Sequence, residues 1–163
     1  MLCAMMLAPA IVLAPAAGAH PGAAPWEADG KPGRQSCEAC HFEAAPVKGS
    51  VALSLAGLPA KIEPGHVYEL TLTLRHAGMK VAGFLVSAMG GTFAGGEGVE
   101  VEGAAARSTL ARAKQADVAI WRFSWRAPEK TLREAAFFVS ANAGNDDQSP
   151  FGDTIYMDVV TAK

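Results

Sequence analysis

A strict alternation of apolar and polar side chains near the middle of the sequence narrows the possible folds more than any other feature. The alternation covers eight residues: Tyr68, Glu69, Leu70, Thr71, Leu72, Thr73, Leu74 and Arg75. Successive side chains of a β-strand point to opposite faces, so this pattern predicts a strand with one face in a core and the other in water.

Other segments repeat this pattern between frequent turns. Trp121, Phe123 and Trp125 alternate with polar residues, and Pro128 follows them. The sequence contains 17 Gly and 10 Pro, which favour strands and turns over long helices. Shorter strand-like runs occupy residues 51–55, 81–89, 135–141 and 154–160, and the run at 81–89 has the composition of a mostly buried strand. Residues 103–117 fit either a short helix or a bent strand. Six or seven short strands predict an all-β fold, an immunoglobulin-like antiparallel β-sandwich.

The N-terminal residues 1–19 have the features of a secretory signal peptide. They are apolar throughout and end in Ala17-Gly18-Ala19, a small-x-small cleavage pattern. The apolar run is too short to cross a bilayer comfortably. We therefore expect a mature chain that begins at His20, has no membrane span, and lies in the periplasm or outside the cell.

The mature chain divides into two parts near residue 50. Residues 20–50 are rich in Pro and Gly and predict an irregular leader, because proline fixes φ and keeps the preceding residue out of a helix. Residues 51–163 hold the expected strands. Charge is nearly balanced, with 14 Lys and Arg against 16 Asp and Glu, so nothing in it points to nucleic acid.

The leader contains the run Cys37-Glu38-Ala39-Cys40-His41. Two thiols separated by two residues can add to the two vinyl groups of a porphyrin, and the following His41 then lies under the iron as its proximal ligand. Export strengthens this interpretation, because haem is attached to c-type proteins after translocation. The sequence therefore predicts one covalent haem c held by Cys37, Cys40 and His41.

Two other interpretations of the cysteine pair stay open. A zinc site would take Cys37 and Cys40 as two ligands and two histidines as the rest, since the sequence has no second CxxC. A redox-active pair or a simple structural disulfide is the other. A thioredoxin-like pair normally follows a strand and opens a helix, whereas this one lies in a Gly- and Pro-rich leader.

The sixth iron ligand is harder to choose. His76 continues the apolar face of the strand at 68–74, and Met79 follows in the same turn, so either is a possible distal ligand. Met at this position would raise the potential relative to a second His. An open iron position is a further option. The other candidates are His20, His66, Met89 and Met157.

Two other parts of the sequence could bind a metal ion. A mature N-terminal His20 has an amine and an imidazole that together can clamp copper, provided that a second histidine joins them. A cluster of amides and carboxylates at 142–153 has oxygens that calcium prefers, but its spacing fits no EF-hand loop. We expect these side chains to make turns through hydrogen bonds to the backbone.

From residue 58 onward, short motifs recur in a definite order along the sequence. They are Leu58-Pro59, Pro64-Gly65 with Tyr68, Gly83-Phe84, Trp121 to Trp125 with Ala127-Pro128, Ala141-Asn142 with Asn145 and Asp147, and Gly152-Asp153 with Ile155-Tyr156. In these motifs the sequence resembles the reelin-domain-like (Reeler) group and its bacterial choice-of-anchor relatives. The resemblance implies an extracytoplasmic immunoglobulin-like sandwich, and bacterial members often carry CxxCH just before it. Membership of the group implies little about activity.

These observations predict an exported mono-haem c-type electron carrier rather than an enzyme, with a redox protein as its partner. The chain lacks the C-terminal helix of small cytochromes c, so the haem is expected to be held by a loop against a sheet with an exposed edge. The first alternative is a secreted β-sandwich binding module with a CxxC disulfide. A second alternative is an extracellular copper protein that uses His20.

Overall fold

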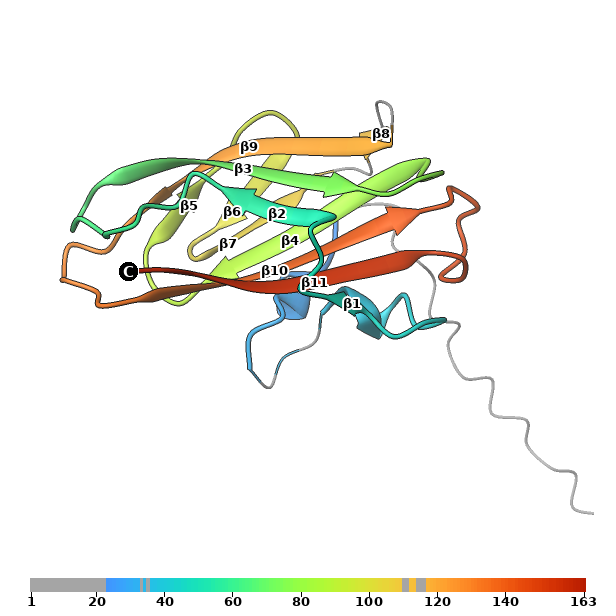
Figure 1. The fold of residues 1–163 in the computed structure, drawn as a ribbon, viewed down its shortest axis with the longest axis horizontal. Coiled ribbons are helices and arrows are strands. Elements are labelled where there is room, and N and C mark those ends of the chain that lie inside the picture. Colours follow the sequence, from blue (N-terminus) through green and yellow to red (C-terminus); the bar gives the residue numbers. More distant parts are fainter. Residues whose placement is uncertain (1–22, 33, 35, 110–111, 114–116) are drawn as a thin grey trace, which may run out of the picture.

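The computed structural model describes residues 23–32, 34, 36–109, 112–113 and 117–163, and this part of the chain is almost entirely β (Figure 1). Two single turns of 3-10 helix, η1 (Trp26–Ala28) and η2 (Cys37–Ala39), precede the strands. The strands are β1 (Val47–Lys48), β2 (Leu53–Ala56), β3 (Val67–Arg75), β4 (Val81–Ala88), β5 (Thr92–Ala94), β6 (Val99–Glu102), β7 (Ala105–Ser108), β8 (Arg112–Ala113), β9 (Val118–Arg126), β10 (Ala135–Gly144) and β11 (Thr154–Ala162).

The strands form two sheets that pack face to face. The larger sheet has the order β1-β11-β10-β4-β7-β6, with β8 also paired to β4, and the smaller has the order β2-β3-β9-β5. Figure 1 shows β3 and β9 in one layer and β10 and β11 in the other. All pairings are antiparallel except that of β1 with β11. The predicted antiparallel β-sandwich is confirmed.

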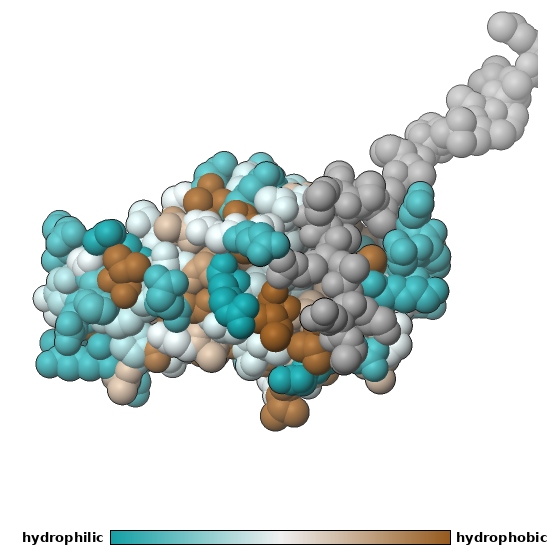
Figure 2. Space-filling model, turned by 90° about the horizontal axis from the view of Figure 1, so that it is seen from above, coloured by the Kyte–Doolittle hydropathy of each residue, from teal (hydrophilic) through white to brown (hydrophobic). Residues whose placement is uncertain are grey.

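The alternation seen in the sequence sets the inner face of the smaller sheet. Leu70, Leu72 and Leu74 of β3 are at most 1% exposed, as a strand with one face in the core requires. On β9, Trp121 and Trp125 are also buried, and Leu72 lies directly opposite Trp121 in the register. Figure 2 views the molecule from the side on which β3 and β9 lie, where polar residues separate small apolar groups.

Aromatic rings from both sheets interlock between the layers. Phe84 of β4 stacks on Phe123 of β9 at 5.5 Å between ring centroids and tilts against Trp121 at 4.9 Å. Phe137 of β10 meets Trp125 edge to face at 5.0 Å. Such pairs add specific geometry to large apolar areas removed from water, so they fix how the two sheets lie on one another.

The segment at 103–117 is a broken strand in the part that is described. β7 pairs with both β4 and β6, and β8 pairs with β4 further along. Between these two pairings, the backbone N–H of Phe84 donates instead to the hydroxyl of Ser108, at 3.1 Å. The ladder therefore opens beside Gly83, and this opening lies at the cavity described below.

The leader packs against the outer face of the larger sheet (Figure 1). Ser87 on that face is fully buried and its hydroxyl donates to the Asp29 carbonyl at 2.8 Å. The guanidinium of Arg107 lies 4.0 Å from the centroid of the Trp26 ring, and β1 continues the sheet beside β11. The leader is irregular, as predicted, but it is also a layer of the molecule.

Among the described residues, no helix has the length and apolar character needed to cross a bilayer. The predicted signal peptide, including its cleavage point before His20, lies outside the described residues.

Replacing Phe84 by Ala should lower the free energy of unfolding by about 3–5 kcal/mol, because it removes a buried ring that contacts the opposite sheet. Urea unfolding followed by tryptophan fluorescence measures this. Val51→Ala is the matched control, because Val51 is 97% exposed and its loss should change stability by less than about 0.5 kcal/mol. Equal effects of the two substitutions would contradict the packing described here.

Candidate functional site

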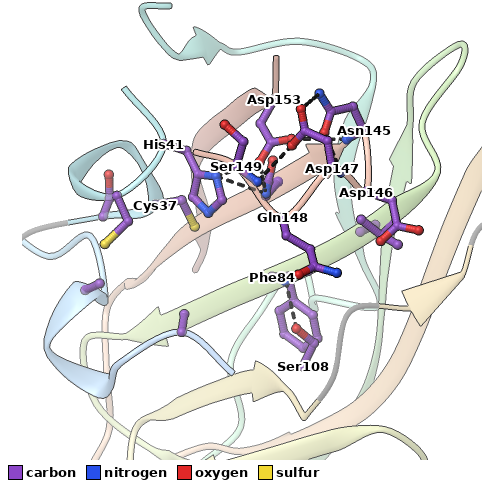
Figure 3. A pocket seen from close by; sticks show the side chains of 18 of the residues that line it. Cys37, His41, Phe84, Ser108, Asn145, Asp146, Asp147, Gln148, Ser149 and Asp153 are labelled. Carbon is purple, nitrogen blue, oxygen red and sulfur yellow. Dashed lines mark hydrogen bonds and ion pairs between the residues drawn. The ribbon is translucent and has the colours of Figure 1, made fainter. Parts of the chain in front are cut away.

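A cavity of about 340 Å³ lies between the leader and the outer face of the larger sheet. The leader contributes Cys37, Cys40 and His41 to its wall, so the structure brings all three predicted haem-binding residues to one cavity (Figure 3). The opposite wall comes from β4, and the rim from residues 145–149 and Asp153.

The backbone of η2 holds the CxxCH run in a compact turn. The N–H groups of Cys40 and His41 both donate to the carbonyl of Cys37, at 3.3 and 3.1 Å. Both cysteines are half-buried free thiols. A single tight turn is therefore enough to present two thiols and one imidazole to the same space.

The ring of His41 is held by the carboxylate of Asp153, which comes much later in the chain. Its Nδ1 lies 2.6 Å from Oδ2 of Asp153, and the Asp153 side chain is only 6% exposed. Asn142 Nδ2 donates to the same oxygen at 3.0 Å, and the Asn145 N–H donates to Oδ1 at 3.1 Å. Figure 3 shows these contacts converging on Asp153. This arrangement fixes the ring of His41 and uses its Nδ1.

The hydrogen bonds around Asp153 also fix the orientation of Asn142. Its amide nitrogen lies 3.4 Å from Nδ1 of His41, and the two are neighbours because both donate to the same carboxylate oxygen. A reversed amide would place Oδ1 against the carboxylate. Oδ1 of Asn142 is consequently a buried acceptor with no partner among the described residues, on a side chain that lines the cavity. Such an unsatisfied atom is costly and needs an explanation, such as a bound group.

Gly83 leaves the space that the cavity occupies. On β4 the neighbouring Ala82 and Phe84 belong to the sandwich core, so position 83 faces the outer side, under the leader. A Cβ atom there would meet Ser108 Oγ at 3.2 Å, tighter than ordinary van der Waals contact. Any larger side chain would extend into the cavity.

Burial raises the pKa of the Cys37 thiol, because the thiolate loses its hydration. The Ser140 hydroxyl has no hydrogen bond of good geometry in the described part of the chain, yet it lies near enough to the thiol to oppose part of this rise. Cys37 in the haem-free chain is therefore a poor thiolate nucleophile at neutral pH.

Two exposed aromatic rings lie beside the CxxCH run. Phe42 and Phe151 are each 50% exposed and meet edge to face at 5.5 Å. Glu43 ties the same two segments together, since its carboxylate accepts from the Gly152 N–H. The surface beside His41 thus carries two exposed aromatic rings, and contacts there join the leader to the β10–β11 loop.

The amide and carboxylate cluster forms turns, as expected from the sequence. Asn145 Oδ1 accepts from the Asp147 N–H at 3.1 Å, and Asp147 Oδ1 accepts from the Ser149 N–H at 2.8 Å. Across the described residues, no three His, Cys, Asp or Glu side chains come together in a way that would hold a metal ion directly. The zinc and calcium alternatives therefore find no ready-made site in that part of the chain.

The structure does not bring the two proposed distal ligands to the cavity. Met79 is 1% exposed inside the sandwich core, and His76 Nδ1 lies 2.8 Å from the Tyr156 hydroxyl. They lie away from the cavity because both follow β3, a strand of the smaller sheet. The cavity lies on the outer face of the larger sheet. The expectation that His76 or Met79 ligates the iron is not carried further.

The remaining candidates are also placed away from the cavity or are not described. His66 is exposed, and its ring lies tilted against that of Tyr68. Met89 is 58% exposed at the end of β4. Met157 accepts a weak hydrogen bond from the Ser36 hydroxyl at 3.5 Å, beside Cys37 but outside the cavity wall. His20, and with it the copper alternative, lies outside the described residues.

Sequence reasoning missed the residues that support the CxxCH run. Asp153 and Asn142 were assigned to turns, and Gly83 to the Reeler resemblance, because nothing local links them to His41. Only the pairing of β10 with β4 and β11 brings them beside the leader.

Comparison with solved structures identifies the architecture. The crystal structure of the human F-spondin reeler domain is 17% identical, covers 72% of this chain and 92% of its own, and superposes with a TM-score of 0.56. The Reelin-N domain of F-spondin is 17% identical, covers 77% of this chain and 93% of its own, and has a TM-score of 0.58. The chain has a Reeler-type fold. No protein-family model matches the sequence, and a search of curated proteins finds no match. The Reeler-type fold is thus shown by structure rather than by sequence identity.

In the haem-free chain, alkylation of Cys37 by iodoacetamide should reach its half-maximal rate at a higher pH when the chain is folded than when it is unfolded in urea. The reason is that burial raises the pKa of this thiol, so less thiolate is present at a given pH. Mass spectrometry of the peptide that carries Cys37, in Cys40→Ala, isolates the reaction at this thiol. Coincident pH profiles in the folded and unfolded chain would show that the thiol is not desolvated.

Proposed function

We propose that this chain is a mono-haem c-type electron-transfer protein of the periplasm or cell exterior, with haem bound covalently to Cys37 and Cys40 and with His41 as the proximal iron ligand. One observation carries the proposal: both thiols and His41 line a single cavity, and the ring of His41 is already fixed through Nδ1. Metal-ligating histidines commonly use their second ring nitrogen in this way.

The cavity fits such a group in two respects. Its leader wall includes the apolar residues Pro25 and Ala28, as a porphyrin face requires. Gly83 leaves open a space on the strand that a side chain would fill.

A bound haem supplies a one-electron couple, and the protein supplies its attachment, orientation and access. Cys37 and Cys40 hold the ring to the leader, while the Asp29–Ser87 and Arg107–Trp26 contacts hold the leader to the sheet. The exposed rings of Phe42 and Phe151 next to His41 provide an apolar surface for a redox protein. A leader held to the sheet in this way keeps the geometry of the iron ligand constant between the two oxidation states.

The second candidate is a secreted β-sandwich binding module whose Cys37 and Cys40 form a disulfide. The observation in its favour is the likeness to the reeler domain of F-spondin, which covers most of both chains. This alternative assigns no task to His41 or to its bond with Asp153, whereas the haem proposal uses both.

Co-expression of the chain with a cytochrome c maturation system should add the mass of one haem that survives denaturation and should give a c-type absorption band. Cys37→Ala with Cys40→Ala should abolish covalent haem, because both thioether bonds are lost. A mass two protons below the reduced form, with no visible band, would reject the haem proposal and support the disulfide-bearing module.

The iron ligand is tested separately by His41→Ala, which should change the absorption spectrum of any haem that remains attached. His66→Ala is the matched control, since His66 is an exposed histidine that contacts Glu63 and Tyr68 instead of the cavity. Identical spectra for His41→Ala and the unsubstituted protein would show that His41 is not an iron ligand.

Filling the cavity should affect the haem-loaded protein more than the haem-free protein. Gly83→Val places a branched side chain in the cavity and requires only a small shift of Ser108. We expect the melting temperature of the haem-loaded form to fall by several degrees, while that of the haem-free form changes less. Calorimetry on both forms measures this, and an equal fall in both would mean that the cavity does not hold the cofactor.

A further inference from the structure

We infer that Asp153 is a positioning residue that lowers the reduction potential of the iron by accepting the Nδ1–H hydrogen bond of His41. The inference rests on the proposed function and deepens it, because it assigns the control of the potential to one carboxylate of this chain. The CxxCH motif by itself requires no acidic residue at this position.

The geometry singles out Asp153 among the carboxylates near the cavity. Its Oδ2 is 2.6 Å from His41 Nδ1, which is short for a hydrogen bond between a nitrogen and an oxygen. Its side chain is 6% exposed and that of His41 is 16% exposed, so water competes little for the contact. Asp147 lies on the same loop, but its contacts are with Asn145 and Ser149.

The donors around Asp153 define its role as an acceptor. Two assigned donors point at its two oxygens: the Asn142 amide donates to Oδ2 and the Asn145 backbone N–H donates to Oδ1. The 2.6 Å contact between His41 Nδ1 and Oδ2 needs one hydrogen between the two atoms. Because both oxygens of Asp153 already accept, we assign that hydrogen to His41 Nδ1, which leaves Nε2 for iron.

A carboxylate acceptor makes the imidazole a stronger electron donor than a neutral carbonyl acceptor does. Hydrogen bonds of this kind raise the basicity of a metal-bound histidine, and outer partners are a recognised means of tuning a haem. A more strongly donating ligand stabilises ferric over ferrous iron. The expected consequence is a potential lower than the same ligands would give without Asp153.

The test compares Asp153→Asn with Asp147→Asn in the haem-loaded full chain, by redox titration of the absorption band. Asp153→Asn keeps the shape of the side chain and replaces the charged acceptor by a neutral one. Asp147→Asn removes an equal charge from the same loop without touching His41, so it gives the effect of an exposed and screened carboxylate near the cavity. We expect both potentials to rise, and that of Asp153→Asn to rise more.

A second substitution predicts the opposite sign and does not disturb Asp153 itself. Asn142→Val removes the amide that shares Oδ2 with His41, so the hydrogen bond from His41 should strengthen and the potential should fall. Water admitted by a loosened fold would also lower the potential, so the melting temperature of Asn142→Val is measured beside it. A fall in potential without a fall in melting temperature supports the inference, and a fall in both counts against it. This substitution keeps the inference testable if Asp153→Asn proves too unstable to purify.

The outcomes separate the inference from the proposed function. Covalent haem on both variants, with equal shifts for Asp153→Asn and Asp147→Asn, would overturn the inference, leave the haem proposal standing, and make Asp153 an anchor of the β10–β11 loop. A rise in the potential of Asn142→Val would count against it as well. Absence of covalent haem on the unsubstituted chain would overturn both.

Discussion

The docking of the leader on the outer face of the larger sheet is the contact on which the candidate site depends. Without it, Leu85 and Ser87 would be exposed on a sheet that otherwise faces water, and the CxxCH run would have no opposite wall. The buried hydrogen bond from Ser87 to the Asp29 carbonyl is central, because an unpaired hydroxyl or carbonyl in that interface would be costly. The sandwich supplies a rigid surface, and the leader turns that surface into a cavity.

The strands were predictable because their signal is local. Alternation over β3 and β9 identified the residues that fill the core, and the nearly continuous apolar run of β4 indicated a strand covered on both faces. The leader is what covers its second face. The ends were less accurate: β10 runs past Ala141 to Gly144 and β11 to Ala162, because pairing with neighbours extends a strand beyond its own propensity.

The cavity was predictable only in part, because half of it is assembled from distant parts of the chain. Cys37, Cys40 and His41 carry their signal in five consecutive positions, but Asn142 lies 101 residues from His41. Parity along β3 placed His76 on the face of Leu70 to Leu74, and Met79 was chosen because it follows in the same turn. Neither observation showed that the CxxCH run docks on the other sheet, and layer assignment is a property of topology rather than of any single segment.

The order of the elements along the chain determines when the leader can dock on the sandwich. The leader precedes every strand of the sandwich that it later covers, so under the proposed export it would emerge first and have nothing to dock against. The thiols of Cys37 and Cys40 would then be open to a haem-attaching enzyme. Once β4, β10 and β11 have paired, the leader docks and burial raises the pKa of the Cys37 thiol. Under the proposed function, haem attachment therefore belongs to the interval between translocation and folding, and the folding rate of the sandwich limits how long that interval lasts.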